Sequence, residues 1–217
     1  PIFLFESSEG FIHTSNRRKY MFRLLLGFWI MGILNGILNA YFSTGGLIIN
    51  NIFGTLFLGT VYMQSMDYFK QKQIGKGLLW FIVPLLISAL PFVVFSSPDI
   101  LSNPAILIGF QLFNLIVPSL MMTEGGFLFV LLAVAFYLFH GKKWLQISAI
   151  GVVALISAAS YNFQELFGAN HQWMMILAAI PIILYNGEKG RGMRNFFYIF
   201  YPAHIAIFAI ISFFMQR

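Results

Sequence analysis

The chain has 217 residues, of which 59% are hydrophobic and only 9% are charged. A soluble domain carries about 25% charged residues, so this composition excludes a water-soluble fold and indicates that much of the chain lies in lipid. It contains no cysteine, which excludes disulfides, thiol catalysis and zinc–thiolate sites. The net charge of +6 is typical of cytoplasmic Lys and Arg in a membrane protein, and we expect no nucleic-acid partner.

Long apolar runs divide the chain. A helix needs about 20 apolar residues to cross a membrane, because the hydrocarbon core is about 30 Å thick and a helix rises about 1.5 Å per residue. An opening stretch over residues 1–14 is too short to cross if it starts at Pro1. Eight full runs follow: 20–42, 47–66, 77–95, 104–122, 125–139, 144–160, 172–185 and 196–214.

These runs predict the fold class. Barrel strands would alternate apolar and polar residues with a period of two, and the runs are too continuous for that. Lipid offers no partner to unpaired backbone groups, so the runs form helices. We predict an all-α fold, a polytopic integral membrane helix bundle with eight full hydrophobic segments after a partial N-terminal one. No repeat or linker divides it, so residues 1–217 form a single domain.

Loops rich in Lys and Arg indicate orientation, since such loops favour the cytoplasm. Four are visible: 16–19, 70–76, 140–143 and 186–194. The first two loops are separated by two runs and lie on one side, as do the last two. Three runs lie between the pairs if 104–122 and 125–139 both cross, which would place the second pair outside. Either one of these runs is re-entrant, or the charge rule fails here.

The opening stretch carries the first group of ionisable residues. Charged groups inside membrane segments are costly, so each is a candidate for function. Glu6, Glu9, His13 and Arg17 are spaced by three, four and four residues, which places them on one helix face. A Glu–His pair can orient a catalytic imidazole or contribute to a metal site, although the sequence alone assigns no metal-ligand set. The alternatives are an ion stripe between helices and a polar helix end.

Three other ionisable residues lie at the ends of apolar runs, and each has its own interpretation. Glu124 lies in a Gly-rich hinge, where it would either bind a cation or ammonium group or lie at a water-exposed helix end. His140, beside two lysines, is predicted to be interfacial. His171 opens an apolar run after a polar loop, and we predict a capping or surface role.

The C-terminal part combines a basic loop with an imidazole inside the last apolar run. The loop 186–194 has several Gly residues and cations, and it can wrap an anion with help from the backbone N–H groups of the following helix. His204 lies eight residues beyond Phe196, about 12 Å into the last helix. An imidazole there either bonds to a neighbouring helix or takes part in chemistry.

Several stretches resemble the TraX family. The C-terminal signature is matched by Tyr185-Asn186-Gly187 with Lys189-Gly190, and by Phe200-Tyr201-Pro202-Ala203-His204. Residues 1–14, with Glu9-Gly10-Phe11-Ile12-His13-Thr14, and residues 19–25 look like the family's second hydrophobic segment and the helix after it. The Glu124-Gly125-Gly126 hinge also fits. The family's usual first segment, with an Asp–His pair, is absent, so we expect the chain to be truncated at its N-terminus.

The resemblance implies a function. The family is named for acetylation of the N-terminus of conjugative pilin, and it is similar to the wider group of polytopic membrane acyltransferases. It implies a multi-pass acetyltransferase of the bacterial inner membrane, with acetyl-CoA as donor and a pilin N-terminus or a surface polymer as acceptor. Two other classes stay open: an ion- or proton-coupled transporter that uses Glu9, His13 and Glu124, and a noncatalytic assembly factor for a pilus or surface polymer.

Acyl transfer requires a base and a donor to the oxyanion. Under the resemblance, the base candidates are His204 and His13, the latter beside Glu9, together with the His of the absent family segment. We expect the following residues to bind acetyl-CoA: Lys189, Arg191, Arg194, Arg17, Tyr201 and Asn186.

Overall fold

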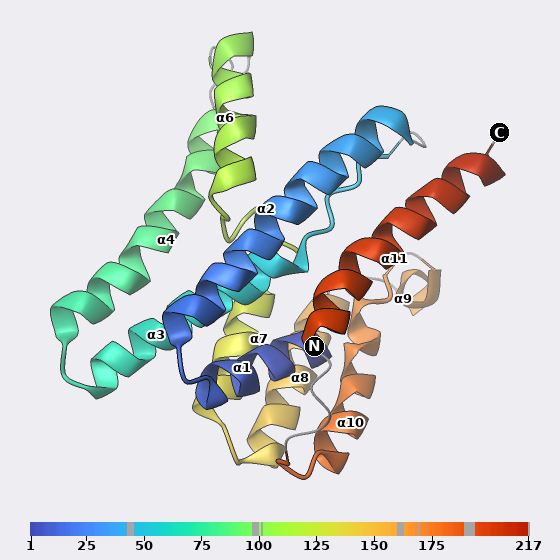
Figure 1. The fold of residues 1–217 in the computed structure, drawn as a ribbon. Coiled ribbons are helices and arrows are strands. Elements are labelled where there is room, and N and C mark those ends of the chain that lie inside the picture. Colours follow the sequence, from blue (N-terminus) through green and yellow to red (C-terminus); the bar gives the residue numbers. More distant parts are fainter. Residues whose placement is uncertain are drawn as a thin grey trace.

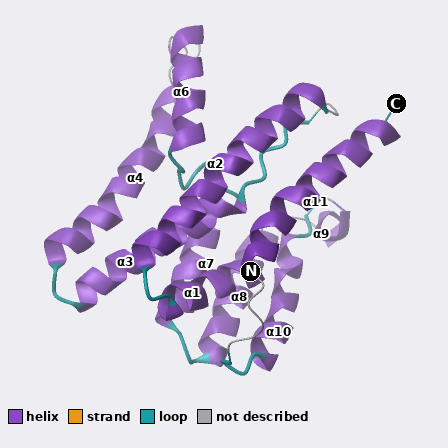
Figure 2. Cartoon of the chain, in the orientation of Figure 1, coloured by secondary structure: helices purple, strands orange, loops and turns teal. Residues whose placement is uncertain are grey.

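The computed structural model describes residues 1–42, 46–96, 100, 102–159, 163–168, 170–188 and 194–216. Every regular element in these ranges is a helix, which confirms the all-α membrane bundle (Figure 1, Figure 2). Each of the eight predicted runs contains a helix. The elements are α1 (Ile2–His13), α2 (Arg17–Tyr41), α3 (Ile52–Lys70), α4 (Ile74–Ser96), α6 (Pro104–Ile116), α7 (Gly126–Leu138), α8 (Lys143–Ala158), α9 (Phe163–Gly168), η1 (Gln172–Ala178), α10 (Ala179–Leu184) and α11 (Arg194–Met215).

Within the described ranges, three helices are long and apolar enough to cross a membrane by length and composition. They are α2, α4 and the Phe196–Met215 part of α11. Much of α4 and α11 is exposed on the protein surface, as expected of helices that face lipid. The shorter apolar helices α6, α7, α8 and η1–α10 complete the bundle.

Helix α3 forms the centre of the bundle and packs against α1, α2, α4 and α7. Small residues allow its neighbours to approach closely, as is common between membrane helices. A β-carbon added at Gly59 would lie 3.1 Å from the Ala133 side chain, and one added at Gly54 would lie 2.8 Å from the Thr123 methyl group. The glycines of α3 therefore set its distance from α7 and from the segment before α7.

The segment before α3 is extended, so the predicted run 47–66 becomes helical only at Ile52. Side-chain amides of α2 hold it in place. Asn35 Nδ2 donates to the Asn50 carbonyl (2.9 Å), and Asn39 both donates to Ile48 O (3.0 Å) and accepts from Ile48 N (2.8 Å). These amides satisfy peptide groups that would otherwise lack partners in lipid.

Helices α6 and α7 are both short. Each has 13 residues, about 20 Å of helix, which is shorter than the hydrocarbon core. The segment 117–125 between them lies against the middle of the neighbouring helices. Trp29 of α2 donates to Ile116 O (2.8 Å), and Leu120 N donates to the hydroxyl of Ser88 in α4 (2.8 Å). The break between the two runs 104–122 and 125–139 therefore lies inside the bundle, which favours a single crossing made by both runs together.

This arrangement brings the basic loops to one end of the bundle. Arg17 pairs with Asp67 near the end of α3, Glu9 contacts His140 after α7 (2.9 Å), and Lys143 Nζ donates to Ile183 O in α10 (2.8 Å). We call this end, formed by residues 14–19, 70–76, 139–143 and 185–188, the basic end. It gathers these exposed cations: Arg18, Lys19, Lys70, Lys72, Lys76, Lys142 and Lys143.

Candidate functional site

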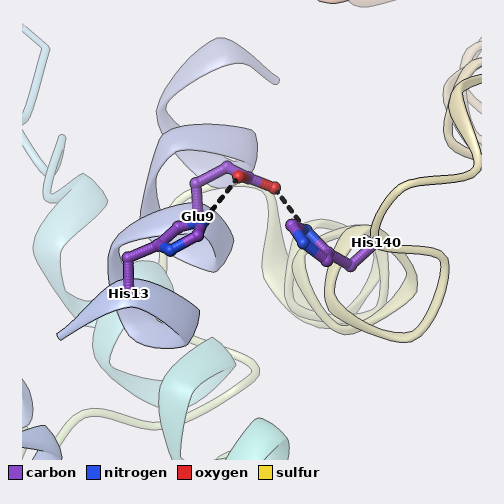
Figure 3. Close-up of side chains that lie close together, drawn as sticks. All are labelled: Glu9, His13 and His140. Atoms are coloured by element: carbon purple, nitrogen blue, oxygen red, sulfur yellow. Dashed lines mark hydrogen bonds and ion pairs between the residues drawn. The ribbon is translucent and has the colours of Figure 1, made fainter. Parts of the chain in front are cut away.

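A carboxylate lies between two imidazoles at the basic end (Figure 3). Glu9 Oε1 is 2.9 Å from His140 Nδ1, and Glu9 Oε2 is 3.5 Å from His13 Nε2. His13 follows Glu9 by one helical turn on α1, whereas His140 lies 131 residues beyond Glu9, just after α7. We call Glu9, His13 and His140 the Glu9 cluster.

The packing of α1 on α7 creates this cluster. Phe5 contacts Phe136 edge to face, with ring centroids 5.7 Å apart, and Phe11 contacts Tyr137 in the same way at 5.9 Å. α7 ends at Leu138, and Gly141, at a φ of 76° that favours glycine, turns the chain into α8. His140 is therefore presented from a tight turn, opposite the face of α1 that carries Glu9.

The cluster lines a cavity of about 270 Å³ between α1, the α7–α8 turn, α8 and the residues after α10. The Glu9 side chain is 12% exposed, but His13 and His140 are 63% and 43% exposed. The carboxylate is thus sheltered while both imidazoles are accessible from the basic end. This arrangement suits a group that orients an imidazole for proton transfer.

Other residues of the cavity have defined hydrogen bonds, among them Lys143 and Asn186. Lys143 Nζ donates to Ile183 O, near the C-terminus of α10, where a cation is favourable. Asn186, predicted to bind the cofactor, donates to Glu188 Oε2 (3.0 Å) and accepts from Glu188 N (3.0 Å). The structure therefore brings three predicted site residues, Glu9, His13 and Asn186, to one cavity.

Arg17, also predicted to bind the cofactor, belongs to a charge network beside the cluster. Its guanidinium pairs with Asp67, which also accepts a hydrogen bond from the Tyr137 hydroxyl. It lies 4.6 Å from the centroid of the Phe11 ring. The Asp67 side chain is 9% exposed, and that of Arg17 is 35% exposed. The network fixes the start of α2 against α3 and α7.

Tyr201, the third described residue predicted to bind the cofactor, lies in another part of the bundle. Its hydroxyl donates to Glu124 Oε2 (2.6 Å) and accepts from Ile52 N (3.1 Å). Thr55 Oγ1 donates to the Glu124 carbonyl (2.7 Å). Glu124 is therefore hydrogen-bonded inside the bundle, where it joins α11 to α3. Tyr201 and Glu6 line a second cavity of about 290 Å³ beside α1.

His204 lies one turn beyond Tyr201 on α11 and does not join the Glu9 cluster. Its ring stacks on Phe200 with centroids 5.3 Å apart and meets the Tyr201 ring edge to face at 5.2 Å. Its Nδ1 is 3.0 Å from Phe200 O. The described contacts of His204 are thus with its own helix.

Three predicted cofactor residues have no described side chain. Lys189 and Arg191 lie outside the described residues. Arg194 is the first residue of α11, and only its backbone is described. The described start of this basic loop, at Asn186 and Gly187, lies in the wall of the cavity that holds the Glu9 cluster.

Sequence reasoning missed His140, Asp67 and Tyr137 as partners of the predicted residues. The sequence places His140 beside Lys142 and Lys143, which favours an interfacial role. No spacing relates it to Glu9, because the two meet only through the packing of α1 on α7. One sequence signal could have indicated these contacts: Asp67 is a charged residue at the end of an apolar run, and such a charge needs a partner.

Comparison with known proteins identifies the family. No curated protein and no solved structure matches the chain. The family model described as "TraX protein" matches residues 1–212. The match includes α1 with Glu9 and His13, helices α6 and α7, His140 and most of α11. The chain therefore belongs to the TraX family.

Proposed function

We propose that the protein is a membrane acyltransferase that moves an acetyl group from acetyl-CoA to an amine or hydroxyl acceptor at the Glu9 cluster. The observation that carries the proposal is the 2.9 Å contact of Glu9 with His140 in a cavity that opens at the basic end. Membership of the TraX family supports a membrane function related to the conjugative pilus.

The Glu9–His140 contact sets the proton positions. A carboxylate only accepts hydrogen bonds, so the proton shared with it lies on His140 Nδ1. Nε2 then keeps its lone pair and can accept a proton from the acceptor. Glu9 orients the ring and stabilises the imidazolium that forms. His13, on the other side of Glu9, is the second candidate base.

The proposed reaction is an acyl transfer from the thioester of acetyl-CoA to the acceptor. As the acceptor nitrogen or oxygen attacks the thioester carbonyl, its proton passes to the imidazole and the carbonyl becomes an oxyanion. The C–S bond then breaks, and the leaving thiolate takes the proton from the imidazolium. The products are the acetylated acceptor and CoA thiol. Lys143 keeps two N–H donors beyond its bond to Ile183 O, and it lines the cavity where the oxyanion would form.

The exposed cations of the basic end match a polyanionic donor. Lys142 and Arg18 add charge there, and Arg17 keeps N–H groups beyond its pair with Asp67. Lys189, Arg191 and Arg194 extend the same loop in the sequence. We place the basic end in the cytoplasm of a bacterium, where acetyl-CoA is available, and the bundle in the inner membrane as a multi-pass protein. Pilin or a surface polymer is the proposed acceptor.

Release of CoA thiol tests this proposal. The protein in proteoliposomes, supplied with acetyl-CoA and a primary amine, should release thiol faster than empty vesicles. Glu9→Gln should reduce the rate, and His171→Ala, which changes an exposed histidine outside the cluster, should not. Proton or ion flux without thiol release would support the transporter instead. If the protein shows neither flux nor thiol release, the noncatalytic assembly factor is the remaining class.

A further inference from the structure

The geometry of the Glu9 cluster points to a second property: we propose that Glu9, His13 and His140 form a binding site for one divalent transition-metal ion of the zinc class. Each residue offers one ligand atom, and these three atoms lie within 4.8 Å of one another. Glu9 Oε1 is 2.9 Å from His140 Nδ1, and the other carboxylate oxygen, Oε2, is 3.5 Å from His13 Nε2. Ligands in a tetrahedral zinc site lie about 3.4 Å apart, since the bonds are about 2.0–2.2 Å long.

The donor set selects the class of metal. Two imidazoles and one carboxylate suit zinc and its neighbours in the first transition row, whereas magnesium and calcium prefer oxygen ligands alone. Glu9 and His13 are four residues apart on one helix, the spacing that places two metal ligands on the same face. His140 supplies the third ligand from a separate element, as a chelating site requires.

The surroundings allow the small movements that binding needs. His13 and His140 are exposed enough to change rotamer without disturbing the core. Lys143, a cation that lines the same cavity, is bonded to Ile183 O of α10. The cavity leaves room for water as a fourth ligand, as in zinc sites with three protein ligands.

Metal binding has a consequence for catalysis, and this consequence alone rests on the proposed function. A histidine nitrogen that ligates a metal cannot accept a proton, and Glu9 cannot hold both a metal and the His140 ring in its catalytic position. Zinc should therefore inhibit acetyl transfer. A chelator should restore the rate.

Titration with Zn²⁺ tests the site directly. The full chain, purified in detergent without a polyhistidine tag, should bind one Zn²⁺ per chain by calorimetry, and excess Mg²⁺ should not compete. Glu9→Gln, His13→Ala and His140→Ala should each weaken binding by about 10- to 100-fold or more, the range seen when even outer-shell partners of a metal are removed. His171→Ala should bind like the parent.

Cobalt provides a readout that does not depend on whether the variants fold. Co²⁺ bound to the parent should give the visible absorption of a tetrahedral or five-coordinate ion with imidazole ligands. A parent that binds no stoichiometric Zn²⁺, or whose affinity is unchanged in His13→Ala and His140→Ala, would overturn the proposal.

The two proposals fail separately. Zinc binding without thiol release would refute the acyltransferase and leave the metal site. Thiol release by a parent that binds no zinc would refute the metal site and leave the acyltransferase.

Discussion

At the scale of single residues, the buried charges are paired and the accessible ones are clustered. Asp67 lies almost fully inside the bundle, where Arg17 and Tyr137 supply its partners. Such a pair adds little net stability, because both charges lose water, but removing one partner leaves the other unpaired. The Glu9 carboxylate is similarly sheltered, yet its two partners are exposed histidines.

The different exposure of Arg17 and Asp67 predicts unequal effects of their substitution on stability. Arg17→Met leaves a buried carboxylate without its cation and should cost roughly 3–5 kcal/mol. Asp67→Asn should cost less, because Arg17 is 35% exposed and can turn to water. The double variant should recover part of the loss seen in Arg17→Met. Thermal unfolding in detergent, followed by circular dichroism, measures all three. Equal midpoints for the two single variants would contradict this account.

At the scale of helices, the break between α6 and α7 is the feature that organises the bundle. Gly125 and Gly126 both have positive φ, at 73° and 56°, at the junction where the segment 117–125 meets the start of α7. The peptide groups of this break find partners in Trp29, Thr55 and Ser88. Non-helical backbone is tolerated at membrane depth only when protein surrounds it in this way.

The break predicts the effect of two glycine substitutions. A β-carbon at Gly125 would adopt an unfavourable backbone conformation and overlap the Phe129 ring, so Gly125→Ala should be destabilising by more than about 1–2 kcal/mol. At Gly109 of α6, a β-carbon meets open space, and Gly109→Ala should be neutral or stabilising by up to about 1 kcal/mol. Comparison of their unfolding midpoints checks the pair, and a larger loss for Gly109→Ala would contradict the description of the break.

At the scale of the whole molecule, the described parts of the basic loops lie at one end of the bundle, the arrangement that the charge rule favours. The sequence predicted the eight apolar helices, since lipid and helix length determine them. It left open whether 104–122 and 125–139 both cross, because hydropathy records apolar length and not the hydrogen bonds that hold a break. It grouped Glu9 with His13 through helical spacing. It missed His140, whose position depends on the packing of α1 on α7, and it placed His204 at the site although its described contacts are along α11.

The topology can be tested in the native chain, because that chain has no cysteine. Single cysteines at Gln73, Lys142 and Glu188 should react with a membrane-impermeant thiol reagent from the same side. Gly46→Cys follows the C-terminal end of α2, a helix that starts at the basic end with Arg17, and it should react from the other side. Labelling of Lys142→Cys and Gln73→Cys from opposite sides would mean that α6 and α7 cross separately.

We propose that acetyl transfer takes place at the Glu9 cluster and not at His204. The most direct measurement is the rate of CoA thiol release by His140→Ala and His204→Ala, each reconstituted at equal protein with a primary amine acceptor. We expect His140→Ala to lose about 100-fold or more, the usual contribution of a general base. We expect His204→Ala, whose described contacts are with its own helix, to keep most of the parent rate. A parent-like rate in His140→Ala together with a loss in His204→Ala would contradict the account and move the base to α11.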